Sequence, residues 1–185
     1  MSYLNIMQKF IKLENQPIFM SYCIIVRGPA GVGKTTIAKK LTNLLRGVYI
    51  SYDDIMRKNK IDLIEGDGIS TENFIEANKI ILAIIKQKDV VVLDGCFYRE
   101  KQIEHLLREL KEKAYIFTLV ADLKACLIRN EKRKNPMTKK AIIDVFKLVS
   151  KIDIGIKIQT DGKTIEETVE TIMSKLSKEG IKNIG

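Results

Sequence analysis

The sequence predicts an α/β fold in which a doubly wound, five-stranded parallel sheet carries helices on both faces. Three observations indicate this fold. Short apolar runs alternate with segments of helical periodicity, as they do in serial βα units. The first apolar run leads into a glycine-rich loop that a helical pattern follows. The third run, residues 90–93, is apolar throughout, as expected of a parallel strand that is covered on both faces.

Five strands are expected where apolar and β-branched residues gather, because these side chains suit the pleated, partly buried surface of a sheet. A helical pattern separates each strand from the next, which favours parallel strands with helices on both faces. The five ranges are 23–26, 48–52, 90–93, 115–120 and 154–159.

The first expected helix covers residues 35–45, with Ile37, Leu41 and Leu44 on one face and Gly47 placed to end it. A second helix is expected from Thr71, a residue type that caps helices, to about residue 87. Between them, residues 58–70 are expected to form a mobile loop. The remaining helices are a charged segment ending near residue 113, a segment opened by Asp122 and ending near residue 132, a segment opened by Thr138 after Pro136, and residues 164–176.

Composition favours a single soluble domain. The chain has 185 residues, of which 45% are hydrophobic and 30% charged, and this balance argues against disorder. No apolar run approaches the ~20 residues that cross a bilayer, and residues 1–20 lack the apolar stretch of a signal peptide. Cys23, Cys96 and Cys126 lie far apart, and His105 is the only histidine, so we expect reduced thiols in a cytoplasmic protein without a multi-histidine metal site.

The formal net charge of +9 favours anionic partners such as nucleotides, phosphates or nucleic acid. The alternative is that a lysine-rich composition serves solubility alone. The sequence carries no sign of the oligomeric state.

A P-loop is the strongest motif in the chain. Residues 28–35 fit the pattern GxxxxGK[ST], between an expected strand and an expected helix. Glycines let the backbone N–H groups surround phosphates, and the helix N-terminus adds a favourable dipole. Lys34 is expected to reach the β- and γ-phosphates of ATP, and the Thr35 hydroxyl to ligate Mg²⁺. The expected nucleotide-binding residues are Gly28, Pro29, Ala30, Gly31, Val32, Gly33, Lys34, Thr35 and Thr36.

Carboxylates follow two of the expected strands at their carboxyl ends, which face the ligand crevice of such a sheet. Asp54 after the second strand could deprotonate an acceptor hydroxyl, while Arg57, one helical turn later, holds the acceptor or the phosphate. The alternative is that Asp53 and Asp54 merely cap a helix, and the choice of base between them stays open. Asp94 occupies the Walker B position, where it could hold Mg²⁺ together with Thr35. Its alternative role is a turn-forming Asp-Gly pair.

A basic segment near residue 130 is expected to form a lid. Arg129 and Arg133 have the spacing of one helix face, and the segment ends at Pro136. Such a lid excludes water and brings guanidinium charge to the transferring phosphate. A solvated basic helix end is the alternative.

These motifs together resemble the nucleoside-kinase-like group of P-loop phosphotransferases, above all the polynucleotide 5′-hydroxyl kinases and the seryl-tRNA kinases. The resemblance rests on GPAGVGKT, SYDDIMR, VVVLDG and LIRNEKRKNP and covers about residues 22–176. It implies the strand order 2-3-1-4-5, with Asp54 as general base and Arg57 as an acceptor or phosphate contact. It also implies that Arg129 and Arg133 stabilise the transferring phosphate.

Two departures keep a small acceptor in consideration. The stretch from Asp94 to Arg99 is more similar to the DG-x-P-R of nucleoside monophosphate kinases, although it lacks the proline, and no additional phosphatase or helical domain is present. We therefore expect a P-loop kinase domain over residues 20–185, preceded by an N-terminal extension over residues 1–19 that is either a docking helix or an upstream addition. It would transfer the γ-phosphate of ATP to a hydroxyl on RNA or another polynucleotide, or on a nucleotide or small metabolite. A non-catalytic NTP-binding switch or NTPase is the third alternative, against which the Asp54/Arg57 pair argues.

Overall fold

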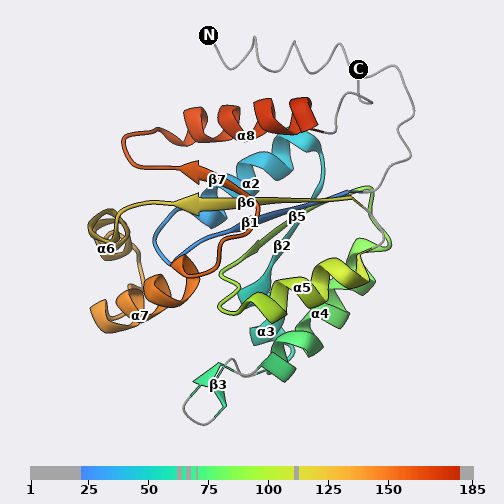
Figure 1. Ribbon diagram of the computed structural model, residues 1–185, viewed down its shortest axis with the longest axis horizontal. Helices are drawn as coiled ribbons and strands as arrows, with labels where there is room; N and C mark the ends of the chain where they lie inside the picture. The colour runs from blue at the N-terminus through green and yellow to red at the C-terminus, as the bar shows by residue number, and fades with distance from the viewer. Residues whose placement is uncertain (1–21, 62–63, 66–67, 70, 111–112, 180–185) are drawn as a thin grey trace.

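The computed structural model describes residues 22–61, 64–65, 68–69, 71–110 and 113–179. Five strands form one parallel sheet in the order β2-β5-β1-β6-β7 (Figure 1). Counted along the chain, this order is 2-3-1-4-5, which confirms the predicted topology and places β1 in the centre. The strands are β1 Tyr22–Arg27, β2 Val48–Ser51, β5 Val90–Gly95, β6 Lys113–Val120 and β7 Ile156–Gln159.

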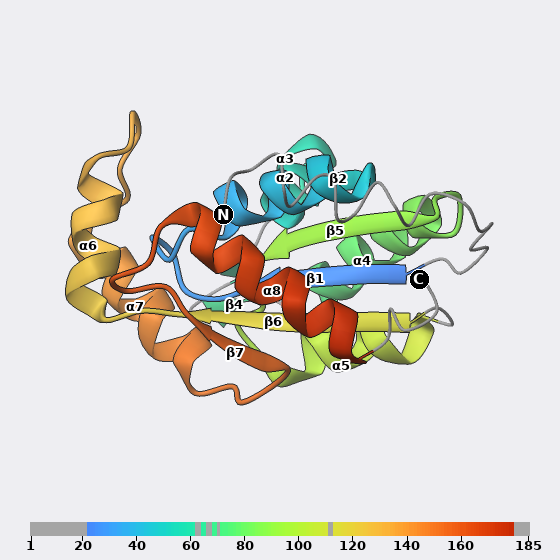
Figure 2. The ribbon, with the colours of Figure 1, turned by 90° about the horizontal axis from the view of Figure 1, so that it is seen from above.

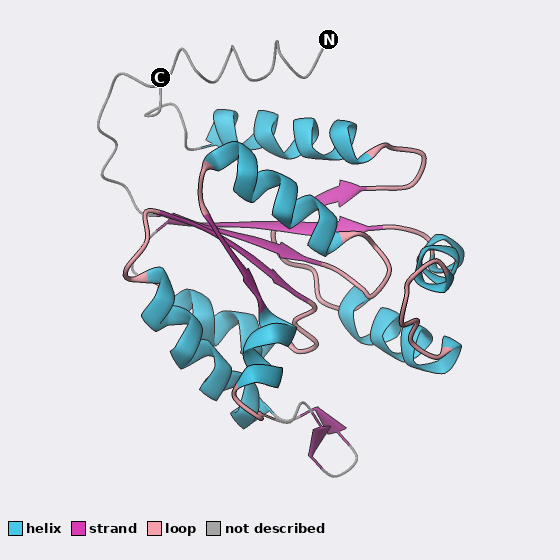
Figure 3. Ribbon diagram, turned by 180° about the vertical axis from the view of Figure 1, so that it is seen from behind, coloured by secondary structure: helices cyan, strands magenta, loops and turns pink. Residues whose placement is uncertain are grey.

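Helices cover both faces of this sheet. Helices α2 and α8 lie on one face and α3, α4 and α5 on the other, while α6 and α7 lie beyond the carboxyl end of β6 (Figures 1 and 3). None of the helices that the structure describes has the length and apolar character needed to span a bilayer. The helices are α2 Lys34–Leu45, α3 Tyr52–Lys58, α4 Thr71–Ile85, α5 Glu100–Glu109, α6 Leu123–Glu131, α7 Lys139–Ser150 and α8 Ile165–Glu179.

Two apolar cores result, one on each face. Along β1, Ile24 and Val26 belong to the core under α2 and α8, whereas Cys23 and Ile25 belong to the core over α4 and α5. This alternation follows from the twofold periodicity of side chains along a strand. It explains why residues 90–93 of β5 are apolar at every position, as the sequence predicted.

Element boundaries differ from the predictions at several positions. Tyr52 is the first residue of α3 rather than the last of a strand, because Ser51 caps this helix by accepting a hydrogen bond from the Asp54 N–H (3.2 Å). At the end of α2 the left-handed residue is Arg46 (φ 51°), not Gly47. Gly47 instead allows a close approach, since a Cβ there would lie 2.9 Å from the Val90 carbonyl oxygen.

The charged helix α5 ends at Glu109, short of the predicted residue 113, because β6 already begins at Lys113. Within the segment predicted as a loop, β3 (Ile64–Glu65) and β4 (Gly68–Ile69) pair as a short antiparallel hairpin. The rest of residues 62–70, the extension over residues 1–19 and the predicted cap by the Thr71 side chain lie outside what the structure describes.

Candidate active site

The P-loop connects the central strand β1 to α2, so its residues lie at the carboxyl edge of the sheet (Figure 1). Gly31 approaches the backbone of α6, and a Cβ there would clash with the carbonyl oxygen of Cys126. Gly33 has a left-handed backbone (φ 105°), and an added Cβ would meet no atom within 4 Å. The loop is therefore packed on one side and open on the other, as a phosphate site requires.

Lys34 extends along the P-loop, where its Nζ donates a hydrogen bond to the Pro29 carbonyl oxygen (3.0 Å). Burial lowers the pKa of Lys34, but the nearby Cys96, Asp94 and Asp53 more than offset this effect and leave that pKa raised. The side chain is thus a fixed cation at the floor of the site.

Thr35 and Asp94, predicted as the magnesium ligands, meet directly. The Thr35 hydroxyl donates to Asp94 Oδ2 (2.6 Å), and the Tyr49 hydroxyl donates to the same oxygen (3.0 Å). A hydroxyl and a carboxylate are oxygen donors of the kind that Mg²⁺ prefers, so this pair fits the predicted ion. Among the described residues no three His, Cys, Asp or Glu side chains cluster as metal ligands. Tyr49 was not predicted, because nothing in its local sequence points to Asp94.

The two acidic residues at the start of α3 have different surroundings. The carboxylate of Asp54 forms an exposed ion pair with Arg57 on the same helix. Asp53 as a whole residue is exposed, but its carboxyl is partly desolvated, and its charge interacts with Lys34 and Asp94. Burial raises the pKa of Asp53, while Lys34 acts in the opposite direction. Asp53 is thus the carboxylate that shares the electrostatic environment of the P-loop, and the base role predicted for Asp54 stays a prediction.

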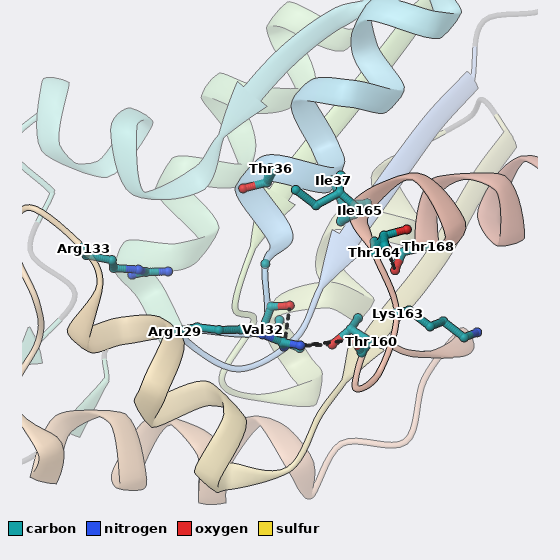
Figure 4. A pocket seen from close by; sticks show the side chains of 12 residues that line it. Val32, Thr36, Ile37, Arg129, Arg133, Thr160, Lys163, Thr164, Ile165 and Thr168 are labelled. Carbon is teal, nitrogen blue, oxygen red and sulfur yellow. Dashed lines mark hydrogen bonds between the residues drawn. The ribbon is translucent and has the colours of Figure 1, made fainter. Parts of the chain in front are cut away.

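Arg129 binds the loop after β7. Its guanidinium donates to the Thr160 hydroxyl (3.1 Å; Figure 4) and to the Thr160 carbonyl oxygen (3.1 Å), and it also pairs with Asp161 (3.4 Å). These partners occupy much of its bonding capacity. The structure therefore places Arg129 as a link between α6 and β7, a position that the sequence spacing did not predict.

Arg133 lies outside α6, whose last residue is Glu131, and its N–H donates to the Asn130 carbonyl oxygen (3.0 Å). Asn130 is buried, and its side chain both donates to and accepts from the backbone of Met137 (2.9 and 3.1 Å). This bidentate contact closes residues 131–136 into a loop that projects beyond α6 (Figure 2). Arg133 and the rest of the basic segment predicted to form a lid lie in this loop, whereas Arg129 lies in α6, and the lid role stays a prediction.

A cleft of about 340 Å³ opens between the P-loop, Arg129 and the loop after β7 (Figure 4). Its volume lies in the range of small-molecule sites. The sequence analysis missed the residues of the β7–α8 connection. The available signal was the position of Thr160 directly after β7, at the carboxyl edge of the sheet. The lining residues are Gly31, Val32, Gly33, Thr36, Ile37, Arg129, Arg133, Thr160, Lys163, Thr164, Ile165 and Thr168.

Comparisons with known proteins agree with this geometry. A model of the AAA domain family AAA_33 matches residues 23–148. A Pyrococcus furiosus protein named "Putative adenylate kinase" is 29% identical over 163 residues, which cover 86% of each chain. Uridine-cytidine kinase D of Dictyostelium discoideum is 33% identical over 107 residues, which are 46% of this chain and only 22% of that protein.

Solved structures extend the likeness in fold. A gluconokinase from Sinorhizobium meliloti has a TM-score of 0.69 and 13% identity, over 88% of this chain and 94% of that one. At this identity the likeness shows the fold alone. The family match covers more than half of the 185 residues, and it includes the P-loop, Asp53, Asp94 and the basic lid. The chain therefore belongs to the AAA domain family AAA_33, and its five-stranded parallel sheet has the strand order of a P-loop kinase fold.

Proposed function

We propose that this protein transfers the γ-phosphoryl group of ATP to a hydroxyl group of a small-molecule acceptor. The observation that carries the proposal is the contact of Thr35 with Asp94 beside Lys34, with a second carboxylate, Asp53, in the same electrostatic environment. The Thr35 hydroxyl and the Asp94 carboxylate suit a magnesium–phosphate complex, and the Asp53 carboxylate is free to act on the acceptor. The names of the matched relatives, a nucleoside kinase and an adenylate kinase, support an acceptor of this size.

In the proposed reaction the acceptor oxygen attacks the γ-phosphorus, and the bond from this phosphorus to the β–γ bridging oxygen breaks. ADP leaves with that electron pair, and the acceptor proton passes to the Asp53 carboxylate. The Lys34 ammonium group holds the β- and γ-phosphate oxygens and stabilises the charge that develops on them. Thr35 and Asp94 would hold Mg²⁺, which supplies charge neutralisation at the phosphates when it is bound.

The nucleoside part of ATP is proposed to occupy the cleft beside Arg129. Ile37 and Ile165 lie near each other and offer apolar surface, and Arg129 with its partner Thr160 borders another part of the cleft (Figure 4). The cleft adjoins Gly33, where the P-loop is open, so base and phosphates would bind in continuous space.

Arg129→Lys is expected to raise the KM for ATP about tenfold with a smaller change in kcat. Lysine keeps the charge but cannot make the paired bonds to Thr160, and a bond from a charged donor contributes ~1.5–3 kcal/mol. Steady-state kinetics at saturating acceptor measure the effect. Arg108→Lys on α5, far from the cleft, is the matched control and should leave the KM unchanged. An unchanged KM in Arg129→Lys would contradict this placement of the nucleoside.

The direct test of the function is incubation with γ-labelled ATP and separate pools of nucleosides, nucleotides, sugar acids, and hydroxyl-ended RNA and DNA. Label on uridine, cytidine, AMP, gluconate or another small compound supports the proposal. Release of labelled phosphate with no labelled acceptor in any pool would instead indicate an NTPase.

A nucleic-acid acceptor is the second candidate, because the positive charge is concentrated on α6, the lid and α7. Between residues 123 and 151 there are nine basic and two acidic side chains, an excess of seven in a chain whose net charge is +9. All residues from 131 to 140 are exposed. A surface of this kind suits a polyanion, although it also serves the phosphates of ATP.

Salt dependence separates the two candidates. If single-stranded RNA is the acceptor, log K for its binding should fall by about 0.7 for each contacted phosphate per decade of salt. Lys139→Ala/Lys140→Ala should then flatten the slope, whereas Lys86→Ala/Lys88→Ala beyond the end of α4 should not. The other basic residues expected to contact the backbone are Lys132, Arg133 and Lys134. A shallow slope for a 5′-hydroxyl oligoribonucleotide at saturating ATP and fixed Mg²⁺ would exclude the nucleic-acid candidate.

A further inference from the structure

Tyr52 is a buried tyrosine at the point where α3 leaves the sheet. It directly precedes Asp53, and only 1% of its surface is exposed. Ser51, the residue before it, pairs in the sheet with Asp94. In the chain, Tyr52 therefore lies between Ser51, which pairs with Asp94, and Asp53, whose carboxylate is proposed to act on the acceptor.

Aromatic packing fixes the Tyr52 ring. It stacks on Phe74 of α4 (centroids 4.5 Å apart, planes at 23°) and meets Phe97 edge to face (5.1 Å, 74°). A Cβ on Gly95 would lie 3.0 Å from the Phe97 ring and 3.1 Å from the Tyr52 Cβ, so the end of β5 packs closely against both rings. Phe97 itself is fully buried in a left-handed conformation (φ 52°), which a bulky residue rarely adopts. The packing thus holds a strained turn directly after Asp94 and Gly95.

A buried polar network continues from the Tyr52 hydroxyl. This hydroxyl has one proton to donate and faces two acceptors, the Phe74 carbonyl oxygen (2.9 Å) and the side-chain oxygen of Asn78, a residue with no exposed surface. The Asn78 amide donates to the Gln102 carbonyl oxygen (3.0 Å), and the Gln102 side chain accepts from the Arg99 N–H (3.0 Å). The network joins the start of α3, the middle of α4 and the start of α5.

Burying the polar groups of this network costs free energy of folding, and the packing of the aromatic rings does not require these groups. A buried hydroxyl and amide must be fully bonded to avoid destabilising the fold, and among the described residues the Gln102 side-chain nitrogen still lacks a partner. A phenylalanine at position 52 would keep both ring contacts but would leave the Asn78 side-chain oxygen without the Tyr52 hydroxyl. The hydroxyl therefore joins α3 to α4 by a polar contact, beyond filling the core.

We propose that Tyr52 is a positioning residue for phosphoryl transfer: its hydroxyl, bonded to Asn78, fixes the start of α3 so that Asp53 stays beside Lys34 and Asp94. The proposal rests on the proposed kinase function. It assigns to α4 and α5, which contribute no residue to the phosphate site described above, the task of holding the acceptor-side carboxylate in place.

The test is Tyr52→Phe, which removes one oxygen atom and retains the ring. We expect kcat to fall about 10- to 100-fold while the KM for ATP changes less than twofold, because a small displacement of a catalytic group costs rate rather than nucleotide affinity. Rates are measured with the acceptor that gives the highest wild-type rate among uridine, cytidine, AMP and gluconate. The matched control is Tyr22→Phe, which removes a hydroxyl from a partly buried tyrosine at the start of β1, the end opposite the P-loop. This variant should keep the wild-type kcat.

A double-variant cycle separates positioning from general destabilisation. In an Asp53→Asn background, Tyr52→Phe should lower kcat less than twofold further, because the group that it positions has already been removed. Thermal unfolding should show the same shift in both backgrounds. Asn78→Ala should reproduce the kinetic pattern and replaces Tyr52→Phe if that variant does not fold.

Equal losses of kcat in the two backgrounds, or an unchanged kcat in Tyr52→Phe, would overturn the positioning role and leave the kinase function intact. Absence of transfer by the wild-type enzyme to every acceptor tested would overturn the proposed function, and the positioning role with it.

Discussion

Lys34→Ala is expected to lower kcat/KM for ATP by at least about 10²–10³-fold. The Lys34 ammonium is the cation fixed at the floor of the P-loop, bonded to the Pro29 carbonyl oxygen and held protonated beside Asp94 and Asp53. Removing it leaves the charge that develops on the phosphates without a preorganised partner, and losses of this size follow removal of one such group. Single-turnover transfer with labelled ATP, together with an ATP-binding titration, measures the effect.

Lys39→Ala is the matched control for this prediction. Lys39 is also a lysine on α2, but it is exposed and its ammonium lies over the Tyr49 ring, 5.4 Å from the ring centroid. Its replacement should change kcat/KM only slightly. Wild-type turnover in Lys34→Ala would remove the P-loop from the mechanism.

Asp53→Asn is expected to lower the rate of transfer by about 10²–10⁴-fold while ATP affinity stays near the wild-type value. Asparagine has nearly the same shape as aspartate but cannot accept the acceptor proton. Asp54→Asn serves as the matched comparison, because it removes only an exposed ion pair with Arg57, and such pairs contribute little. If the rate falls in Asp54→Asn and not in Asp53→Asn, the base is Asp54, as the sequence motif predicted.

The pH dependence of the same reaction is a second test of which residue acts as the general base. Burial raises the pKa of Asp53 above the ordinary aspartate value, and a base must be deprotonated to work. The rate should therefore rise with pH through this raised pKa, so that activity is lost at a higher pH than an unperturbed aspartate would give. Asp53→Asn should abolish this acidic limb of the kcat/KM profile. Retention of the limb in that variant would assign it to another group.

Much of the fold follows from local sequence patterns. The approximate strand ranges and their parallel orientation were predictable because each apolar run is bounded by polar or glycine residues, and parallel strands need helical crossovers between them. The order of the strands was implied by the resemblance to P-loop kinases. The meeting of Thr35 with Asp94 was predictable for a related reason. Asp94 lies near the carboxyl end of β5 and Thr35 follows the neighbouring strand β1, and the carboxyl ends of parallel strands share one edge.

The sequence by itself therefore determined the α/β class, the P-loop and the pair of Thr35 and Asp94. Only the tertiary structure distinguished Asp53 from Asp54, because the rotation of α3 depends on where Tyr52 and Met56 are buried. The partners of Arg129 likewise lie about thirty residues further along the chain, at Thr160 and Asp161, and no local spacing encodes such a contact. Periodic patterns specify which face of an element is buried, but the packing of distant side chains decides which polar group reaches the site.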